Sequence, residues 1–155
     1  MDMGHSIECN EGAHIRSRFV FQAPERLRDD NVRRFRDPFG LEIFVKLAEC
    51  LRTHGYQVSE PEPGKICDAA FIVRFDGFTI WAFLGVGPHA GTIEYSIFTG
   101  VGREWSGKVS RQFACDEWTR LCTLIDQILR QDLGYASVLW LTSHDFEERW
   151  KKDPL

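Results

Sequence analysis

Three glycines in the segment FLGVGPHAGTIEY come closest, in type and spacing, to a phosphate-binding loop. Gly85, Gly87 and Gly91 follow an apolar stretch. A phosphate loop works because its glycines lead into a helix, whose free N–H groups and dipole face the anion. Here they lead into residues 92–100, where apolar and polar residues alternate as in a strand. Residues 85–91 are therefore predicted to form a hairpin connection, with His89 exposed at its tip.

The sequence also lacks motifs for metal binding or nucleophilic catalysis. His5, Cys9 and His14 have no fourth ligand nearby, and neither His-Glu-x-x-His nor Cys-x-x-Cys is present. No Gly-x-Ser-x-Gly turn occurs, and the histidines are scattered along the chain. We therefore expect no catalytic residue, no metal and no cofactor, and predict that the protein is not an enzyme.

Charge and composition narrow the class of partner. The 155-residue chain has a formal net charge of −4, which argues against a nucleic acid or an anionic membrane. The first residues, MDMGHSIECNEGAH, lack the basic and apolar regions of a secretory signal. No apolar run approaches the length that spans a bilayer. The five cysteines are odd in number and favour buried thiols. These features predict a cytoplasmic protein.

The spacing of apolar residues predicts an α+β fold. One helix is expected at about 38–54, where an Asp-Pro pair starts it and Gly55 ends it. A second helix is expected at about 116–133. Between them, residues 67–100 predict an antiparallel meander with an Asp-Gly turn. We expect a sheet of about four strands with both main helices packed on one face. Shorter elements are expected at residues 15–21, 56–58, 137–143 and 144–152.

The domain organisation follows from the length and from the apolar pattern. Residues 1–14 are expected to form a flexible N-terminus, and residues 15–155 a single α+β domain. The unbroken apolar content of residues 78–85 predicts a central strand with both faces covered. Residues 101–113 carry mixed signals and predict a longer loop, or a loop that includes an edge strand, before the second helix.

Acidic side chains and one loop tryptophan are the candidate contacts for a protein partner. Trp105 stands in the polar stretch GREWSGK, as a binding hot spot would. Acidic residues speed association with a basic partner by electrostatic steering. The candidate contact residues are Asp29, Asp30, Glu94, Glu104 and Trp105.

A small acidic α+β domain that is rich in aromatic residues resembles the bacterial immunity proteins of polymorphic and type VI secretion toxin systems. The resemblance rests on HGYQV, FDGFTIWAFLG and TIEYSIFTG, then an amphipathic helix, Trp140 and Trp150, and covers about residues 40–150. It implies a monomer or homodimer that binds a cognate toxin tightly and occludes its active site. Some such proteins guard against nucleases, so a nuclease is one candidate toxin.

Two other classes of function fit the same sequence. A type III secretion chaperone is also small, acidic and α+β, and it would form a dimer that presents apolar grooves to an effector. A small-molecule-binding domain is the third class. Oligomeric state, a ligand screen and the neighbouring genes would separate these classes.

Overall fold

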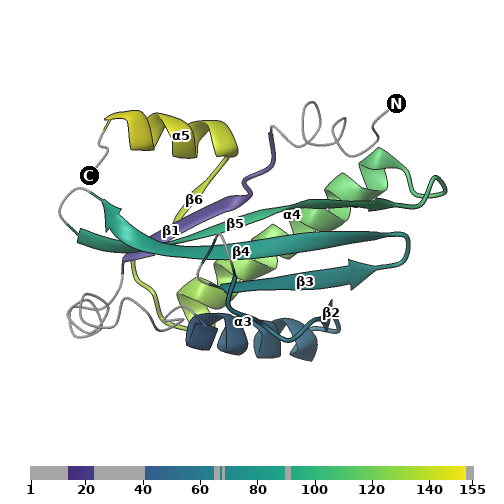
Figure 1. Cartoon of the computed structure of the whole chain (residues 1–155), viewed down its shortest axis with the longest axis horizontal. Coiled ribbons are helices and arrows are strands. Elements are labelled where there is room, and N and C mark those ends of the chain that lie inside the picture. The colour runs from purple at the N-terminus through teal and green to yellow at the C-terminus, as the bar shows by residue number, and fades with distance from the viewer. Residues whose placement is uncertain (1–13, 23–40, 65–66, 68, 90–91, 153–155) are drawn as a thin grey trace.

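The computed structural model of the chain describes residues 14–22, 41–64, 67, 69–89 and 92–152 (Figure 1). At residues 88, 92, 93, 103 and 104 it describes the backbone only. The described elements, in chain order, are β1 (Arg18–Gln22), α3 (Leu41–Thr53), β2 (Gln57–Val58), β3 (Ala69–Phe75), β4 (Phe78–His89), β5 (Thr92–Trp105), α4 (Arg111–Gln127), the π-helical turn η3 (Ile128–Asp132), β6 (Leu139–Leu141) and α5 (Ser143–Lys152).

Six strands form one antiparallel sheet in the order β2-β3-β4-β5-β1-β6. The first strand of the chain, β1, is placed between β5 and the late strand β6. The longest ladder joins β4 to β5, the central pair in Figure 1. Side chains alternate between the two faces of each strand, so the register assigns every strand residue to one face.

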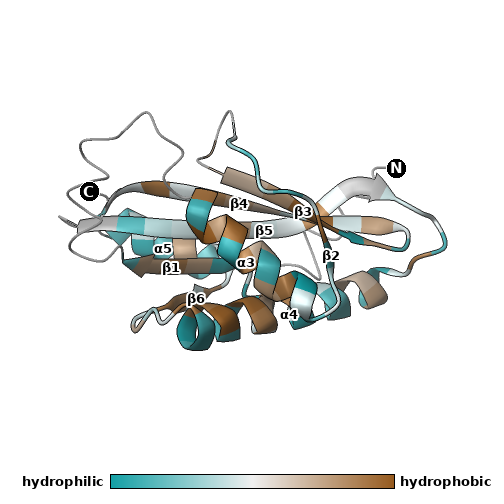
Figure 2. Cartoon of the chain, turned by 90° about the horizontal axis from the view of Figure 1, so that it is seen from below, coloured by the Kyte–Doolittle hydropathy of each residue, from teal (hydrophilic) through white to brown (hydrophobic). Residues whose placement is uncertain are grey.

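The inner face of the sheet, defined here as the face that packs on α3 and α4, holds the core. On α3, the ring of Phe44 lies 4.6 Å from that of Phe71 on β3. On α4, Trp118 Nε1 donates a hydrogen bond to Thr99 Oγ1 of β5 at 2.9 Å. Each large apolar side chain that is fully buried contributes about 1.5–3 kcal/mol. Figure 2 shows alternating hydrophobic and hydrophilic bands on both helices, as expected of helices that bury one side.

Glycine and serine residues set the ends of the elements. Gly55 follows α3 with φ 93°, a conformation that favours glycine, so the predicted stop is confirmed. Gly77 has φ 94° in the two-residue turn between Phe75 and Phe78, which confirms the predicted Asp-Gly hairpin. The Ser110 side chain accepts a hydrogen bond from the backbone N–H of Phe113 at 3.1 Å and caps α4.

The α+β class, the antiparallel sheet and the packing of two main helices on one face are confirmed, but the predicted number of elements is too low. The sheet has six strands, because the short elements expected at 15–21 and 137–143 form β1 and β6, which extend it beyond β5. The short element expected at 144–152 forms a third described helix, α5. α4 begins at Arg111 and not near residue 116, because Ser110 supplies the cap. The predicted loop at 101–113 is also wrong in its first part, since β5 continues to Trp105.

The β4–β5 hairpin corrects the prediction for the glycine segment. β4 continues through Gly85 and Gly87 to His89, so residues 85–91 are not one long connection. His89 is only 3% exposed, because its ring packs against Trp150 of α5 with centroids 5.2 Å apart. The two glycines lie within an extended strand and lead into no helix, which excludes a phosphate loop of the kind described above.

None of the helices in the described part of the chain combines the length and the apolar character needed to cross a bilayer. The predicted flexible N-terminus, residues 1–14, lies outside the described residues apart from His14.

Candidate protein-binding face

The outer face of the sheet, opposite α3 and α4, is unusually apolar. Register places Ile72 opposite Trp81, and Phe83 opposite Phe98, with all four side chains on this face. An antiparallel sheet with one solvated face normally carries polar side chains there. Aromatic residues in these positions therefore need either a cover within the chain or a partner outside it.

Helix α5 supplies a cover over one side of the outer face. Phe146 meets Phe98 edge-on with ring centroids 4.9 Å apart, and Trp150 packs on His89. Between them, Arg149 forms an ion pair with Glu94. Phe146, Arg149 and Trp150 are spaced i, i+3 and i+4, so one stripe of α5 makes all three contacts. Figure 1 shows α5 on the β1–β6 side of the sheet, away from β3.

The Glu94–Arg149 ion pair fixes α5 to β5. Both guanidinium nitrogens Nη1 and Nη2 donate to the carboxylate, at 3.1 and 2.6 Å. Glu94 is 7% exposed, and a charge in such a position is costly unless it is paired. Glu94 therefore has a partner within the chain, and its carboxylate is covered by α5.

The other side of the outer face carries an apolar surface that we call the open patch, formed by Ala70 and Ile72 of β3 and Trp81 and Phe83 of β4. Ile72 is 38% exposed, and the other three side chains are half-buried. The Trp81 and Phe83 rings stack with centroids 4.7 Å apart at 26°. Among the described residues, no helix packs on this patch as α5 packs on Phe98. The predicted central position of β4 is confirmed, but the prediction that both its faces are covered is wrong, because Trp81 and Phe83 are only half-buried.

Glycines on the neighbouring strand and further along β4 shape this surface. A Cβ at residue 100 of β5 would overlap the Trp81 ring, so glycine there leaves room for the indole over β5. Gly85 and Gly87 point to the outer face, and a Cβ at either would meet nothing within 4 Å. Glycine within a strand often marks a place where another backbone approaches closely. On its outer side, β4 thus carries two aromatic rings, at Trp81 and Phe83, followed by a stretch without side chains at Gly85 and Gly87.

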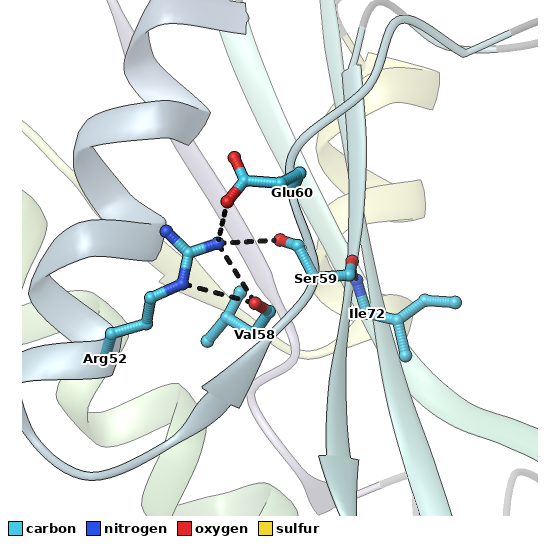
Figure 3. A network of polar contacts seen from close by, with 5 residues as sticks. All are labelled: Arg52, Val58, Ser59, Glu60 and Ile72. Atoms are coloured by element: carbon cyan, nitrogen blue, oxygen red, sulfur yellow. Dashed lines mark hydrogen bonds and ion pairs between the residues drawn. The ribbon is translucent and has the colours of Figure 1, made fainter.

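The edge of β3 that faces away from β4 is covered by β2 and by a clamp that Arg52 of α3 organises (Figure 3). Its guanidinium donates to Val58 O at 3.2 and 3.0 Å and to Ser59 O at 3.2 Å, and it pairs with Glu60 at 3.2 Å. Ser59 in turn bonds both backbone groups of Ile72, at 2.9 and 2.8 Å. Because these groups are occupied, a partner strand cannot add to β3 here. The outer face is thus the surface that β3 and β4 offer to a partner.

The residues proposed from sequence are not brought together in the described structure. Trp105 ends β5 and is half-buried, with its ring 5.9 Å from that of Phe78, so it lines the end of the core. Glu94 lies under α5. The side chain of Glu104 and the whole of Asp29 and Asp30 lie outside the described residues. Trp81 and Phe83 were missed as site residues because their strand is apolar at every position, which resembles a strand covered on both sides.

Groups with other chemistry are few in the described part of the chain. No three His, Cys, Asp or Glu side chains there lie close enough to hold a metal ion. Cys122 is buried against Thr99, and burial raises the pKa of its thiol to about 12, the opposite of what a nucleophile needs.

A surface cavity of about 510 Å³ lies between α4 and β6. Several of its polar groups bond each other, as Gln112 does to Asp116 at 2.8 Å and Trp140 Nε1 to Arg16 O at 2.6 Å. Because these groups already have partners, the cavity points to a ligand less directly than the open patch does. Its lining residues are His14, Ile15, Arg16, Gln112, Cys115, Asp116, Thr119 and Trp140.

Comparison of the chain with protein-family models, with curated proteins and with solved structures gives no match. The function must therefore be argued from the residues of the outer face.

Proposed function

We propose that this chain is a protein-binding domain that neutralises a cognate secreted toxin, as bacterial immunity proteins do, and that it binds the toxin through the open patch. The observation that supports the proposal is the stacked Trp81–Phe83 pair on the part of the outer face that no described helix covers. Tryptophan and other aromatic residues are enriched among the residues that carry most of the binding free energy at protein interfaces.

The shape of the patch favours a protein over a small molecule. Small-molecule sites are concave and enclose most of the ligand, whereas Trp81 and Phe83 are half-buried rings on an open sheet face. The rigid β3–β4 ladder holds both rings in place before binding, so little side-chain entropy is lost on association. The net charge of −4 adds steering toward a basic toxin.

The structure shifts the proposed contacts from the acidic side chains to the aromatic pair. Trp81 replaces Trp105 as the anchor, because Trp105 packs on Phe78. Asp29, Asp30 and Glu104 remain proposed contributors to long-range attraction, which needs no direct contact. Glu94 is proposed to act indirectly, by holding α5 against the sheet.

Co-expression tests this proposal. The wild-type chain is expected to restore growth of cells that produce the toxin domain encoded next to its gene, whereas Trp81→Ala does not. Phe113→Ala is the matched control, because Phe113 is also an exposed aromatic residue, at 50% exposure, but belongs to α4. Rescue by Trp81→Ala at wild-type level, or a neighbouring gene product that is harmless to cells, would contradict the proposal.

The apolar character of the patch also favours a second candidate, a secretion chaperone that shields an effector segment. A chaperone binds unfolded or extended apolar segments, and the open patch is apolar where an inhibitor of a basic active site would be acidic. Light scattering and co-purification separate the two candidates. A stable dimer that prevents aggregation of an effector supports the chaperone. A complex with a folded toxin whose active site is blocked supports the inhibitor.

A further inference from the structure

The two faces of the sheet carry different numbers of helices in the described structure. On the inner face, α3 packs over β3 through Phe44 and α4 packs over β5 through Trp118. On the outer face, α5 packs over β5 through Phe146 and reaches the end of β4 through Trp150, which packs on His89. The half of the outer face above β3 and β4 has no described counterpart to α3.

The uncovered half has the width of one helix. Neighbouring strands lie about 4.8 Å apart, and packed helices lie about 8–10 Å apart. One helix therefore covers about two strands. Since α5 contacts β5, a second helix packed beside it would lie over β4 and β3. Along β4, the stretch from Trp81 to Gly87 spans about 20 Å at about 3.3 Å per residue, the length of about 13 helical residues.

The residues of β4 provide the surface that such a helix needs. At one end, Trp81 and Phe83 with Ile72 of β3 offer apolar area. At the other end, Gly85 and Gly87 have open space above them, so a helix backbone can approach the strand closely. A partner strand could form no backbone hydrogen bonds with this glycine segment, because the backbone groups of a central strand are already paired within the sheet.

Helix α5 shows what kind of helix this face accepts. Its contacting stripe combines two aromatic residues, Phe146 and Trp150, with a charged residue, Arg149, that pairs with a strand residue of opposite sign. On the uncovered half the exposed charged residue is Arg74 of β3, which lies on the same face beyond Ile72. No described side chain forms an ion pair with it. A carboxylate is the complementary group.

We propose that the uncovered half of the outer face binds an amphipathic helix of the partner protein, packed beside α5. Its apolar stripe contacts Trp81, Phe83 and Ile72, small residues of the helix face Gly85 and Gly87, and an acidic residue reaches Arg74. This inference rests on the proposed function and names the partner's structural class.

Two displayed peptide libraries test the helix directly. Both contain peptides of about 15 residues with the same apolar and acidic content; one is patterned as an amphipathic helix, and the other carries prolines that prevent a helix. Peptides selected on the wild-type chain are expected to come from the helical library. Their affinity is expected to fall about 10-fold or more in Trp81→Ala and to stay unchanged in Phe113→Ala. Binders drawn mainly from the proline library would overturn the helix.

Gly85→Val separates the helix from other occupants of the same patch. A Cβ at residue 85 meets nothing within 4 Å in the described structure, and valine suits a strand, so urea unfolding is expected to show an unchanged or higher stability. Helix binding is nevertheless expected to fall about 10-fold or more, because the side chain blocks close approach of the backbones. Gly107→Ala, at a glycine with equally open surroundings, is the control. Equal peptide binding by Gly85→Val and Gly107→Ala would overturn the inference.

The remaining outcomes are also decisive. The wild type could form a dimer in which a second copy covers the open patch, and Trp81→Ala would then be a monomer. That result would overturn the inference. Toxin neutralisation that is lost in Trp81→Ala but kept in Gly85→Val would overturn the helix and leave the proposed function standing. Neutralisation kept by Trp81→Ala removes the proposed function instead, and the peptide result then decides whether the face binds helices.

Discussion

The Trp81 ring occupies its place over β5 only because residue 100 of that strand is glycine. The register of β4 on β5 places Trp81 directly opposite Gly100, so the large ring lies where a side chain is missing. The sequence contains both residues, but their meeting depends on the β4–β5 register, which the sequence leaves open by several positions. Gly85 and Gly87 stand out in the sequence, but their effect on the surface follows from their position inside β4.

The buried ion pair between Glu94 and Arg149 gives a prediction for stability. Glu94→Gln is expected to lower the free energy of unfolding by about 2–3 kcal/mol, because Arg149 loses its charged partner in a largely desolvated position. Glu148→Gln is the matched control, since Glu148 pairs with Lys151 on the exposed side of α5 at 3.7 Å and is expected to change stability by less than about 1 kcal/mol. Urea unfolding of both variants measures the difference, and equal small effects would contradict the account.

The buried thiol of Cys122 gives a prediction for pH dependence. Burial raises its folded-state pKa from 9.0 to about 12, so the folded state favours the protonated thiol. Its contribution is complete below about pH 9 and is lost as the pH rises toward about 12. The stability difference between wild type and Cys122→Ala is therefore expected to shrink by about 2 kcal/mol between about pH 7.5 and pH 10.5. Urea unfolding at the two pH values checks this, and a constant difference would show that the thiol is not held protonated.

At the scale of elements, the sequence predicted those whose ends are marked by strong local residues. Gly55 and the Asp76–Gly77 turn appear where expected, because a positive φ is a local requirement. Short elements at 15–21 and 137–143 were expected, but the pairing of β1 with β6 depends on contacts far apart in the chain, such as Arg18 opposite Leu141, and no local pattern encodes that pairing. The start of α4 was misplaced because the cap, Ser110, stands before a polar first turn.

The clamp that closes the edge of β3 gives a prediction at this scale. Arg52→Met keeps much of the aliphatic packing but removes the hydrogen bonds to Val58 and Ser59. The Ile72 amide, which donates to Ser59 Oγ at 2.8 Å, is expected to exchange with deuterium about 5–30 times faster, the equivalent of about 1–2 kcal/mol. Lys46→Met on the same helix is the control, because Lys46 makes only an exposed pair with Glu42 at 3.7 Å. Unchanged exchange at Ile72 would show that the clamp does not hold the edge.

At the scale of the whole molecule, the sheet has one face that is covered by two helices and another that α5 covers in part (Figures 1 and 2). The candidate site arises from this asymmetry and could not be predicted from sequence. An apolar strand such as residues 78–85 has the same composition whether its second face meets a helix of its own chain or a partner. The acidic residues proposed at first, such as Glu94, stood out because of their charge, but charge alone does not tell a contact residue from an internal ion pair.

The central claim is that Trp81 anchors a protein partner, and calorimetric titration of the toxin domain with wild type and Trp81→Ala tests it most directly. The variant is expected to keep the wild-type free energy of unfolding within about 1 kcal/mol, because the ring is half-exposed. Its affinity for the toxin is expected to fall about 30-fold or more, the equivalent of about 2 kcal/mol at a binding hot spot. Equal affinities of the wild type and a folded Trp81→Ala variant would contradict the account.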